Sequence, residues 1–266
     1  MSSPLSEFLA GTRDEARAAL AGYLPAGYPD LAGSRAAFAA LVDGGCDLVE
    51  VGVPFSDPVL DGPTIQAASG AALAGGFRLR DLFGLVESVS ARGGRPVVMT
   101  YWNPVYAYGV DRFARDLASA GGLGVITPDL VPDEGAEWLA ASQEHGLDRI
   151  FLLAPSSTEE RIISTLAVTS GFVYATSVMG VTGARNAVSS AAPTLVGRIR
   201  EHTSDLAVGV GLGVRSGAQA AEVASFADVV IVGSAFVSKL DEGLPAVTAL
   251  AAELAEGVRG QVATVS

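Results

Sequence analysis

Two carboxylates in the first quarter of the chain stand where acid–base chemistry is possible: Glu50 and Asp61. Glu50 lies inside the apolar run Asp47–Val51, where an acid is costly to bury unless its charge is paired or its proton is used. Asp61 follows eleven positions later. A strand-end Glu that bonds to backbone and solvent is the simpler alternative. Position alone leaves a catalytic and a structural interpretation open.

The loop between these acids carries residues that hold a chain in one shape. Phe55-Ser-Asp-Pro58 and Asp61-Gly-Pro63 combine fixed proline φ angles, turn-forming aspartates and a permissive glycine. Such a loop is ordered at a modest entropic cost. A stiff loop suits an active site.

Glycines follow three apolar runs in the second half of the chain, in Gly180-Val-Thr-Gly183, Gly209-Val-Gly-Leu-Gly213 and Gly233-Ser234. Glycine lets the main chain approach an oxyanion, and a short helix beginning at Ser234 would offer unpaired N–H groups and a positive dipole end. A lone glycine is more often only a turn, but three such segments at matching strand ends predict a phosphate monoester site.

Short apolar runs alternate with alanine-rich helical segments along the whole chain, which predicts a parallel sheet. Eight βα units in one domain spanning 1–266 favour a closed (β/α)8 TIM barrel with extra short helices on the loop face. A doubly wound open sheet is the alternative. The predicted strands are Gly22–Pro25, Asp47–Val51, Pro96–Tyr101, Gly124–Thr127, Ile150–Leu153, Phe172–Thr176, Ala207–Val210 and Val229–Val232.

Helices are predicted between these strands and after the last one. They cover Ser34–Asp43, Arg80–Ala91, Asp111–Ala120, Asp133–His145, Thr158–Val168, Pro193–His202, Ser216–Ser225 and Leu244–Gly257, with an extra helix at Ile65–Gly75 on the second loop. The first few and last several residues are expected to fray. The reactive groups of such a barrel gather at the C-terminal ends of the strands, so both carboxylates belong to one rim.

Composition narrows the possible partners and compartment. A net charge of −12 argues against nucleic acid and anionic membranes as partners, because neither is bound without a basic surface. The apolar runs are too short to span a bilayer, and the first residues lack the features of a secretory signal, which favours the cytoplasm. Cys46 is the only cysteine, so an internal disulfide is impossible.

The residues that are scarce in this chain disfavour other kinds of catalysis. Lys239, the only lysine, falls beyond the eighth predicted strand, which disfavours a Schiff-base aldolase. His145 and His202 end outer helices and are interpreted as exposed helix-end residues, so no metal site is expected. Acid–base work by carboxylates remains.

The chain resembles the tryptophan synthase alpha subunit family, and the Asp47–Gln66 segment carries the most specific match. The similarity extends through Tyr23-Leu-Pro-Ala-Gly-Tyr-Pro29, Met99-Thr-Tyr-Trp-Asn-Pro104, Pro128-Asp-Leu130, Gly180-Val-Thr-Gly183, Val210-Gly-Leu-Gly213 and Val232-Gly-Ser-Ala235. It implies retro-aldol cleavage of indole-3-glycerol phosphate to indole and glyceraldehyde 3-phosphate in tryptophan biosynthesis, with Glu50 and Asp61 as the catalytic pair.

The resemblance also implies roles for residues around the carboxylates. Those implied around the phosphate are Gly183, Gly211, Gly213, Gly233 and Ser234; those beside the carboxylates are Tyr174 and Thr182; those walling the indole are Tyr23, Met99, Leu212 and Ile231. Tyr23 departs from the Phe that many relatives carry, so its hydroxyl must find a partner or water. The four wall residues could equally be plain core.

The family further implies a beta-subunit partner, in an alpha2-beta2 complex, that binds pyridoxal phosphate and receives indole. No cofactor is expected in this chain itself. Asp57 is assigned to subunit contact by the resemblance, although a solvent-facing turn explains it equally well. Three hypotheses remain: the alpha subunit of a two-component synthase, a stand-alone lyase that releases free indole, and a barrel that binds a phosphorylated ligand without turnover.

Overall fold

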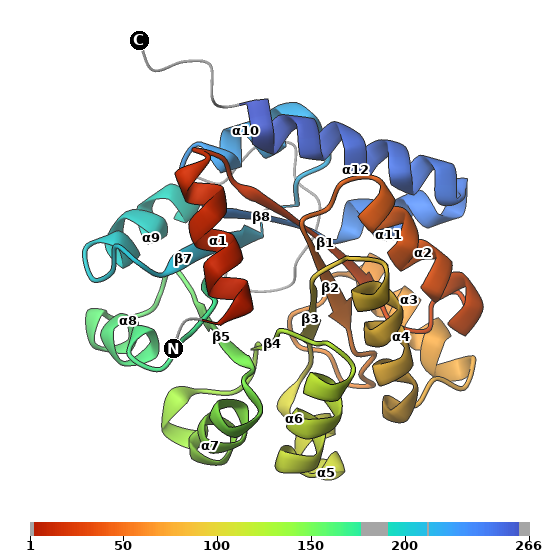
Figure 1. Ribbon diagram of the computed structural model, residues 1–266, viewed down its shortest axis with the longest axis horizontal. Helices are drawn as coiled ribbons and strands as arrows, with labels where there is room; N and C mark the ends of the chain where they lie inside the picture. The colour runs from red at the N-terminus through yellow and green to blue at the C-terminus, as the bar shows by residue number, and fades with distance from the viewer. Residues whose placement is uncertain (1–2, 177–190, 212, 261–266) are drawn as a thin grey trace.

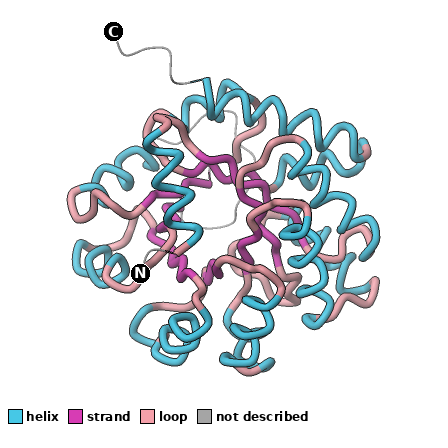
Figure 2. Tube along the Cα trace, viewed as in Figure 1, coloured by secondary structure: helices cyan, strands magenta, loops and turns pink. Residues whose placement is uncertain are grey.

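A computed structural model describes residues 3–176, 191–211 and 213–260, and its strands close into a parallel barrel in which each strand pairs with its neighbours in sequence and β8 pairs with β1. Figure 2 shows the ring of strands inside a ring of helices. The strands are β1 Ala19–Pro25, β2 Leu48–Gly52, β3 Pro96–Met99, β4 Gly124–Thr127, β5 Asp148–Leu153, β6 Phe172–Thr176, β7 Ala207–Gly211 and β8 Val229–Val232. The (β/α)8 prediction is confirmed.

The strands are apolar on both faces because both faces are covered. One hydrophobic cluster fills the barrel and includes Ala21, Leu48 and Ile231, while a second lies between the strands and the outer helices and includes Val49 and Val51. Alternation along β2 therefore turns Glu50 to the inside, on the same face as Leu48. The apolar run around this acid arises from burial on both faces.

The helices that follow the strands surround the barrel (Figure 1). They are α2 Leu31–Asp43, α4 Leu79–Ala91, α6 Val110–Ser119, α7 Ala136–His145, α8 Glu159–Leu166, α9 Ala191–Arg200, α10 Gly217–Ala224 and α12 Leu244–Arg259. The predicted Asp133–His145 helix is divided at Gly135 into a short 3-10 turn, Pro132–Glu134, and α7. A second 3-10 turn covers Leu240–Glu242.

Three further helices lie in the loops after β2, β3 and β8. They are α3 Pro63–Ala74, α5 Trp102–Tyr108 and α11 Ser234–Lys239. The sequence predicted α3 and the start of α11 but not α5, and it extended the third strand to Tyr101. That extension was wrong because Tyr101 is the N-cap of α5, so β3 ends at Met99.

An additional helix, α1 (Pro4–Asp14), crosses one end of the barrel (Figure 1). Its apolar residues Leu5 and Leu9 are fully buried and belong to the cluster inside the barrel. Ser3 caps the helix, and its hydroxyl also donates to Asp148 at the start of β5, with an oxygen–oxygen distance of 2.5 Å. The chain is therefore anchored to the barrel from Ser3 onward.

Carboxylates at the N-terminal ends of strands are paired. Asp47, directly before β2, accepts the backbone N–H of Leu20 at 2.9 Å and lies 3.2 Å from Arg17. Asp228, directly before β8, accepts the N–H of Val208 at 2.6 Å and pairs with Arg200. Each acid thus bonds a neighbouring strand and an arginine at once.

Over the ranges that the structure describes, no helix combines the length and the apolar character that crossing a membrane requires.

Candidate active site

Glu50 is a buried acid without a counter-charge. It lies in the middle of β2 and is only 3% exposed, and within the part of the chain that the structure describes its Oε2 atom has no hydrogen-bond partner. None of the described Lys, Arg or His side chains forms a salt bridge with it. Since a buried polar atom is normally satisfied, this oxygen is available for a ligand.

Asp61 stands at the end of the loop that links β2 to α3. Gly62 is the N-cap of α3, and Pro63 begins the helix. The side-chain amide of Gln66 donates to the backbone carbonyl of Asp61 at 2.8 Å, which fixes the main chain at this residue. Asp61 is half-buried. Helix α3 therefore fixes the position of Asp61 at the end of the loop.

The two acids interact electrostatically and titrate in different ranges. Burial, and secondly the charge of Asp61, raises the pKa of Glu50 to about 8. Burial raises the pKa of Asp61 to about 6. Near pH 7 the site therefore favours a protonated Glu50 beside an ionised Asp61, which are complementary states for an acid and a charge stabiliser.

Two tyrosines extend over glycines on the inner face of the barrel. Tyr23 is paired in register with Glu50, and Tyr174 lies on β6. A Cβ atom at Gly52 would collide with the hydroxyl of Tyr23, and one at Gly211 would collide with the hydroxyl of Tyr174. These positions need glycine because each must accommodate a phenol.

Both phenols stay protonated at neutral pH. Burial raises the pKa of Tyr23, followed by the charges of Asp61 and Glu50. Burial likewise raises the pKa of Tyr174, followed by the charges of Glu50 and Asp61. Within the described residues neither hydroxyl has a hydrogen-bond partner, so each can donate to a ligand.

The other predicted ligand residues lie at strand ends or outside the described residues. Met99 ends β3 and Ile231 lies in β8, and both contact the cluster inside the barrel. Gly233 and Ser234 begin α11, and Gly213 follows β7 with a φ of 66°, which favours glycine. Those outside the described residues are Thr182, Gly183 and Leu212.

Tyr101 is a site residue that the sequence analysis did not single out. It is 5% exposed, and its hydroxyl oxygen accepts the backbone N–H groups of Val59 and Leu60 at 3.1 Å each. Its ring stacks on Phe55, with 5.1 Å between centroids. The signal was its place at the C-terminal end of the predicted third strand, at the rim where Asp61 also stands.

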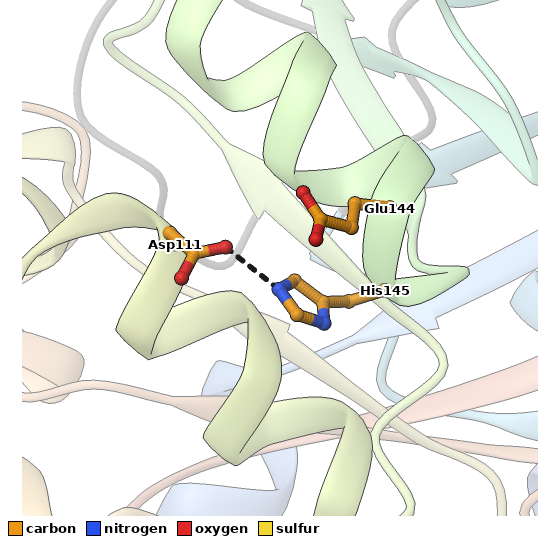
Figure 3. Close-up of side chains that lie close together, drawn as sticks. All are labelled: Asp111, Glu144 and His145. Atoms are coloured by element: carbon orange, nitrogen blue, oxygen red, sulfur yellow. Dashed lines mark hydrogen bonds and ion pairs between the residues drawn. The ribbon is translucent and has the colours of Figure 1, made fainter.

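His145 ends α7, as predicted, but it is only partly exposed, whereas His202 is exposed and lies two residues beyond the end of α9. Figure 3 shows His145 at the end of α7, whose Nε2 lies 2.8 Å from an oxygen of Asp111 on α6. Glu144 is close by, with ligand atoms of all three residues within 4.8 Å of one another. His202 pairs with Glu159 at 2.9 Å. The partners of both histidines are carboxylates of neighbouring helices, whereas Glu50 faces the barrel interior.

Comparison with known proteins is consistent with this geometry. A family model described as tryptophan synthase alpha chain matches residues 9–264. The chain belongs to the tryptophan synthase alpha chain family. It is 66% identical to the alpha chain of Nocardia farcinica over 257 residues, covering 97% of this chain and 96% of that one. It is 67% identical to the alpha chain of Mycobacterium tuberculosis over 243 residues, covering 91% and 90%.

Solved structures of the tryptophan synthase alpha chain family share the fold. A chain of Mycobacterium tuberculosis tryptophan synthase superposes with a TM-score of 0.94 at 63% identity, over 97% of this chain and 99% of that one. The alpha subunit of Legionella pneumophila Paris superposes with a TM-score of 0.86 at 30% identity, over 98% and 100%. The barrel is thus retained while most of the sequence changes.

Proposed function

We propose that this chain uses Glu50 and Asp61 as the acid–base pair of the tryptophan synthase alpha reaction. Members of this family are carbon–carbon lyases of tryptophan biosynthesis that cleave indole-3-glycerol phosphate to indole and glyceraldehyde 3-phosphate. The observation that carries the proposal is the buried, unpartnered Oε2 atom of Glu50 beside a second acid. An unpaired buried carboxyl with a raised pKa suits proton transfer.

The reaction needs a proton at C3 of the indole ring. Protonated Glu50 donates it, and the ring becomes an indolenine that can accept the electrons of the bond to the side chain. That bond then breaks as the neighbouring hydroxyl loses its proton to the Glu50 carboxylate and becomes the aldehyde. The electrons return to the ring as indole, so one carboxyl both gives and takes the proton.

Asp61 has the complementary role. Ionised above about pH 6, its carboxylate accepts the N–H of the indole ring and stabilises the positive charge that develops there. The low polarity that raises the pKa of Glu50 also strengthens this attraction. Two acids in unlike surroundings thus perform different tasks in one step.

The remaining predicted residues hold the two ends of the substrate. We assign the phosphate to main-chain N–H groups around Gly183, Gly211, Gly213, Gly233 and Ser234, and Thr182 to the side of the carboxylates. We assign Tyr23, Met99, Leu212 and Ile231 to the walls around the indole, and Tyr174 to the side of the carboxylates. The support is that Gly211 and Gly233 face the same barrel interior as Glu50.

The partner is proposed to be a tryptophan synthase beta subunit in an alpha2-beta2 complex, which holds pyridoxal phosphate and consumes the indole. The related Mycobacterium tuberculosis structures are of tryptophan synthase, including an aminoacrylate-bound form. Asp57 is exposed on the loop before Asp61 and is assigned to this contact. We place the complex in the cytoplasm and assign no cofactor to this chain.

Indole release by the purified chain tests the proposal. Indole-3-glycerol phosphate is supplied to the chain alone and with a beta subunit from one of the relatives, and indole is measured directly. Turnover that the beta subunit stimulates strongly supports the alpha-subunit function. Full activity of the chain alone would favour a free lyase, and binding of substrate without turnover in both arms would favour a non-catalytic barrel.

A further inference from the structure

The loop that carries Asp61 has few side chains that anchor it. Between β2 and α3 lie residues 53–62, of which Ser56, Asp57 and Val59 are exposed, and Val59 is 66% exposed. Val53 donates its N–H to Met99 at 2.8 Å, which attaches the first residue of the loop to β3. The far end of the loop, directly before Asp61, needs another attachment.

Tyr101 supplies that attachment from the end of β3. Val59 and Leu60 precede Asp61, and their backbone N–H groups donate to the Tyr101 hydroxyl oxygen at 3.1 Å each. Phe55 stacks on the same ring, at an interplanar angle of 30°. One side chain therefore contacts the loop in its first half and immediately before the acid.

The Tyr101 hydroxyl can also donate a hydrogen bond. Two accepted bonds occupy its oxygen lone pairs and leave the phenol hydrogen as a donor. Burial raises the pKa of Tyr101, the N–H group of Leu60 opposes this, and the Asp61 charge raises the pKa further, so the two groups sense one another and the phenol stays protonated. Asp61 and Asp129 are the two acids whose charges act on this phenol.

Tyr101 is itself fixed by the next strand. It is the N-cap of α5, and the N–H of the first helical residue, Trp102, donates to the carboxylate of Asp129 at 2.8 Å. Asp129 lies just after β4. The start of α5 is thereby attached to two strands, which makes Tyr101 a rigid support for the loop.

We propose that Tyr101 is a positioning residue of the lyase reaction, whose hydroxyl clamps the backbone of Val59 and Leu60 and thereby fixes Asp61 against the indole N–H. This inference rests on the role assigned to Asp61 under the proposed function. Tyr101 acts through the acid and does not contact the reacting carbon. A small displacement of a charge-stabilising group lowers the rate far more than substrate affinity.

Tyr101→Phe keeps the ring and the stacking but removes the acceptor. The expected result is a fall in kcat of about tenfold or more with a change in KM below about twofold, because the substrate remains bound while Asp61 is displaced. Tyr106→Phe is the matched control, since Tyr106 lies on α5 and is 65% exposed. The control should keep the wild-type kcat.

A double-mutant cycle separates positioning from general structural damage. In an Asp61→Asn background, Tyr101→Phe should lower kcat by less than about twofold, because the group that it positions is already disabled. An equal fold-loss in both backgrounds would overturn the proposal. If the wild-type chain releases indole and Tyr101→Phe does so with the same kcat, the proposal is also overturned. Absence of indole release from the wild-type chain would instead count against the proposed function.

Amide hydrogen exchange gives a readout that does not depend on activity. Tyr101→Phe should accelerate exchange at Val59 and Leu60 by about tenfold, because two N–H groups lose their acceptor, while exchange in β2 and α3 stays constant. Unchanged protection at both amides would contradict the clamp. Acceleration throughout the barrel would show a global loss of stability and would contradict it as well.

Discussion

The two ends of the barrel treat buried carboxylates in opposite ways. At the start of β2, Asp47 accepts a backbone N–H and lies within 3.4 Å of two arginines, Arg17 and Arg259. Three residues further along the chain, Glu50 has an oxygen with no hydrogen-bond partner among the described residues. The first acid joins elements of the fold, and the second lies in the middle of β2, facing the barrel interior, where we propose that the substrate binds.

The comparison shows how one residue type serves both stability and chemistry. A paired carboxylate remains charged at little cost and bonds strands together. An unpaired one is destabilised as an anion, so its pKa rises until it can donate a proton near neutral pH. What decides between the two is the supply of arginine and N–H groups at each end. Isosteric amide replacements at both ends test this difference.

Glu50→Gln is expected to have the largest effect. It removes the proton donor without changing the shape of the side chain, so kcat should fall by about 10³-fold or more, while binding of glyceraldehyde 3-phosphate should change little. Turnover is measured by indole release and binding by calorimetry. An active Glu50→Gln chain would refute the assigned role.

Asp61→Asn should follow, with a loss in kcat of about 10²-fold, because the charge that balances the cationic ring disappears. The same change should lower the pKa of Glu50, since Asp61 is the second cause that raises it. Kinetics and titration of Glu50 in the variant check the two effects. A loss confined to KM would count against this assignment.

Removing the Glu50 carboxyl should also stabilise the fold at high pH. Its folded pKa of about 8 exceeds the ordinary 4.5, so between these values the folded state holds a proton that the unfolded chain releases. Wild-type stability therefore falls as pH rises through this window, on the order of a few kcal/mol in total. In denaturant unfolding, the free energy of unfolding of Glu50→Gln should exceed that of the wild type at pH 8, and by much less at pH 5. An equal difference at the two pH values would contradict this.

Asp47→Asn should lower stability and leave activity unchanged, and its effect should be the smallest of the four. Arg17 and Arg259 each lose one charged partner, so the free energy of unfolding should fall by about 2 kcal/mol, while kcat is unchanged because the site is at the other end. Asp43→Asn is the control, since its pair with Arg92 is exposed on both sides and should leave unfolding nearly unaltered. A lower kcat in Asp47→Asn would contradict the assignment of this acid to the fold alone.

Much of the barrel was readable from the sequence because its strands are short apolar runs with clear ends. The bounds of β4, β6 and β8 match the prediction. β5 starts two residues earlier than predicted, at Asp148, because an acid that bonds Ser3 can enter a buried strand. Local pattern alone could not show that long-range partner.

Helix α1 was not predicted for the same reason. α1 has the Ser cap, the following Pro and the spaced leucines of a helix, but the reason for its order is the open end of the barrel, which is a tertiary feature. The site was predicted where chemistry marks a residue, as at Glu50 and Asp61. Tyr101 was not, because its role depends on backbone N–H groups from a different loop.

Direct titration of Glu50 tests the central claim most closely. The carboxyl signal is followed across pH by isotope-edited infrared or NMR spectroscopy in the intact chain, with Glu50→Gln as the blank. The account predicts a pKa near 8, shifted downward in Asp61→Asn. A pKa close to the ordinary 4.5 would mean that this carboxylate is satisfied as an anion, and it would contradict its use as the proton donor.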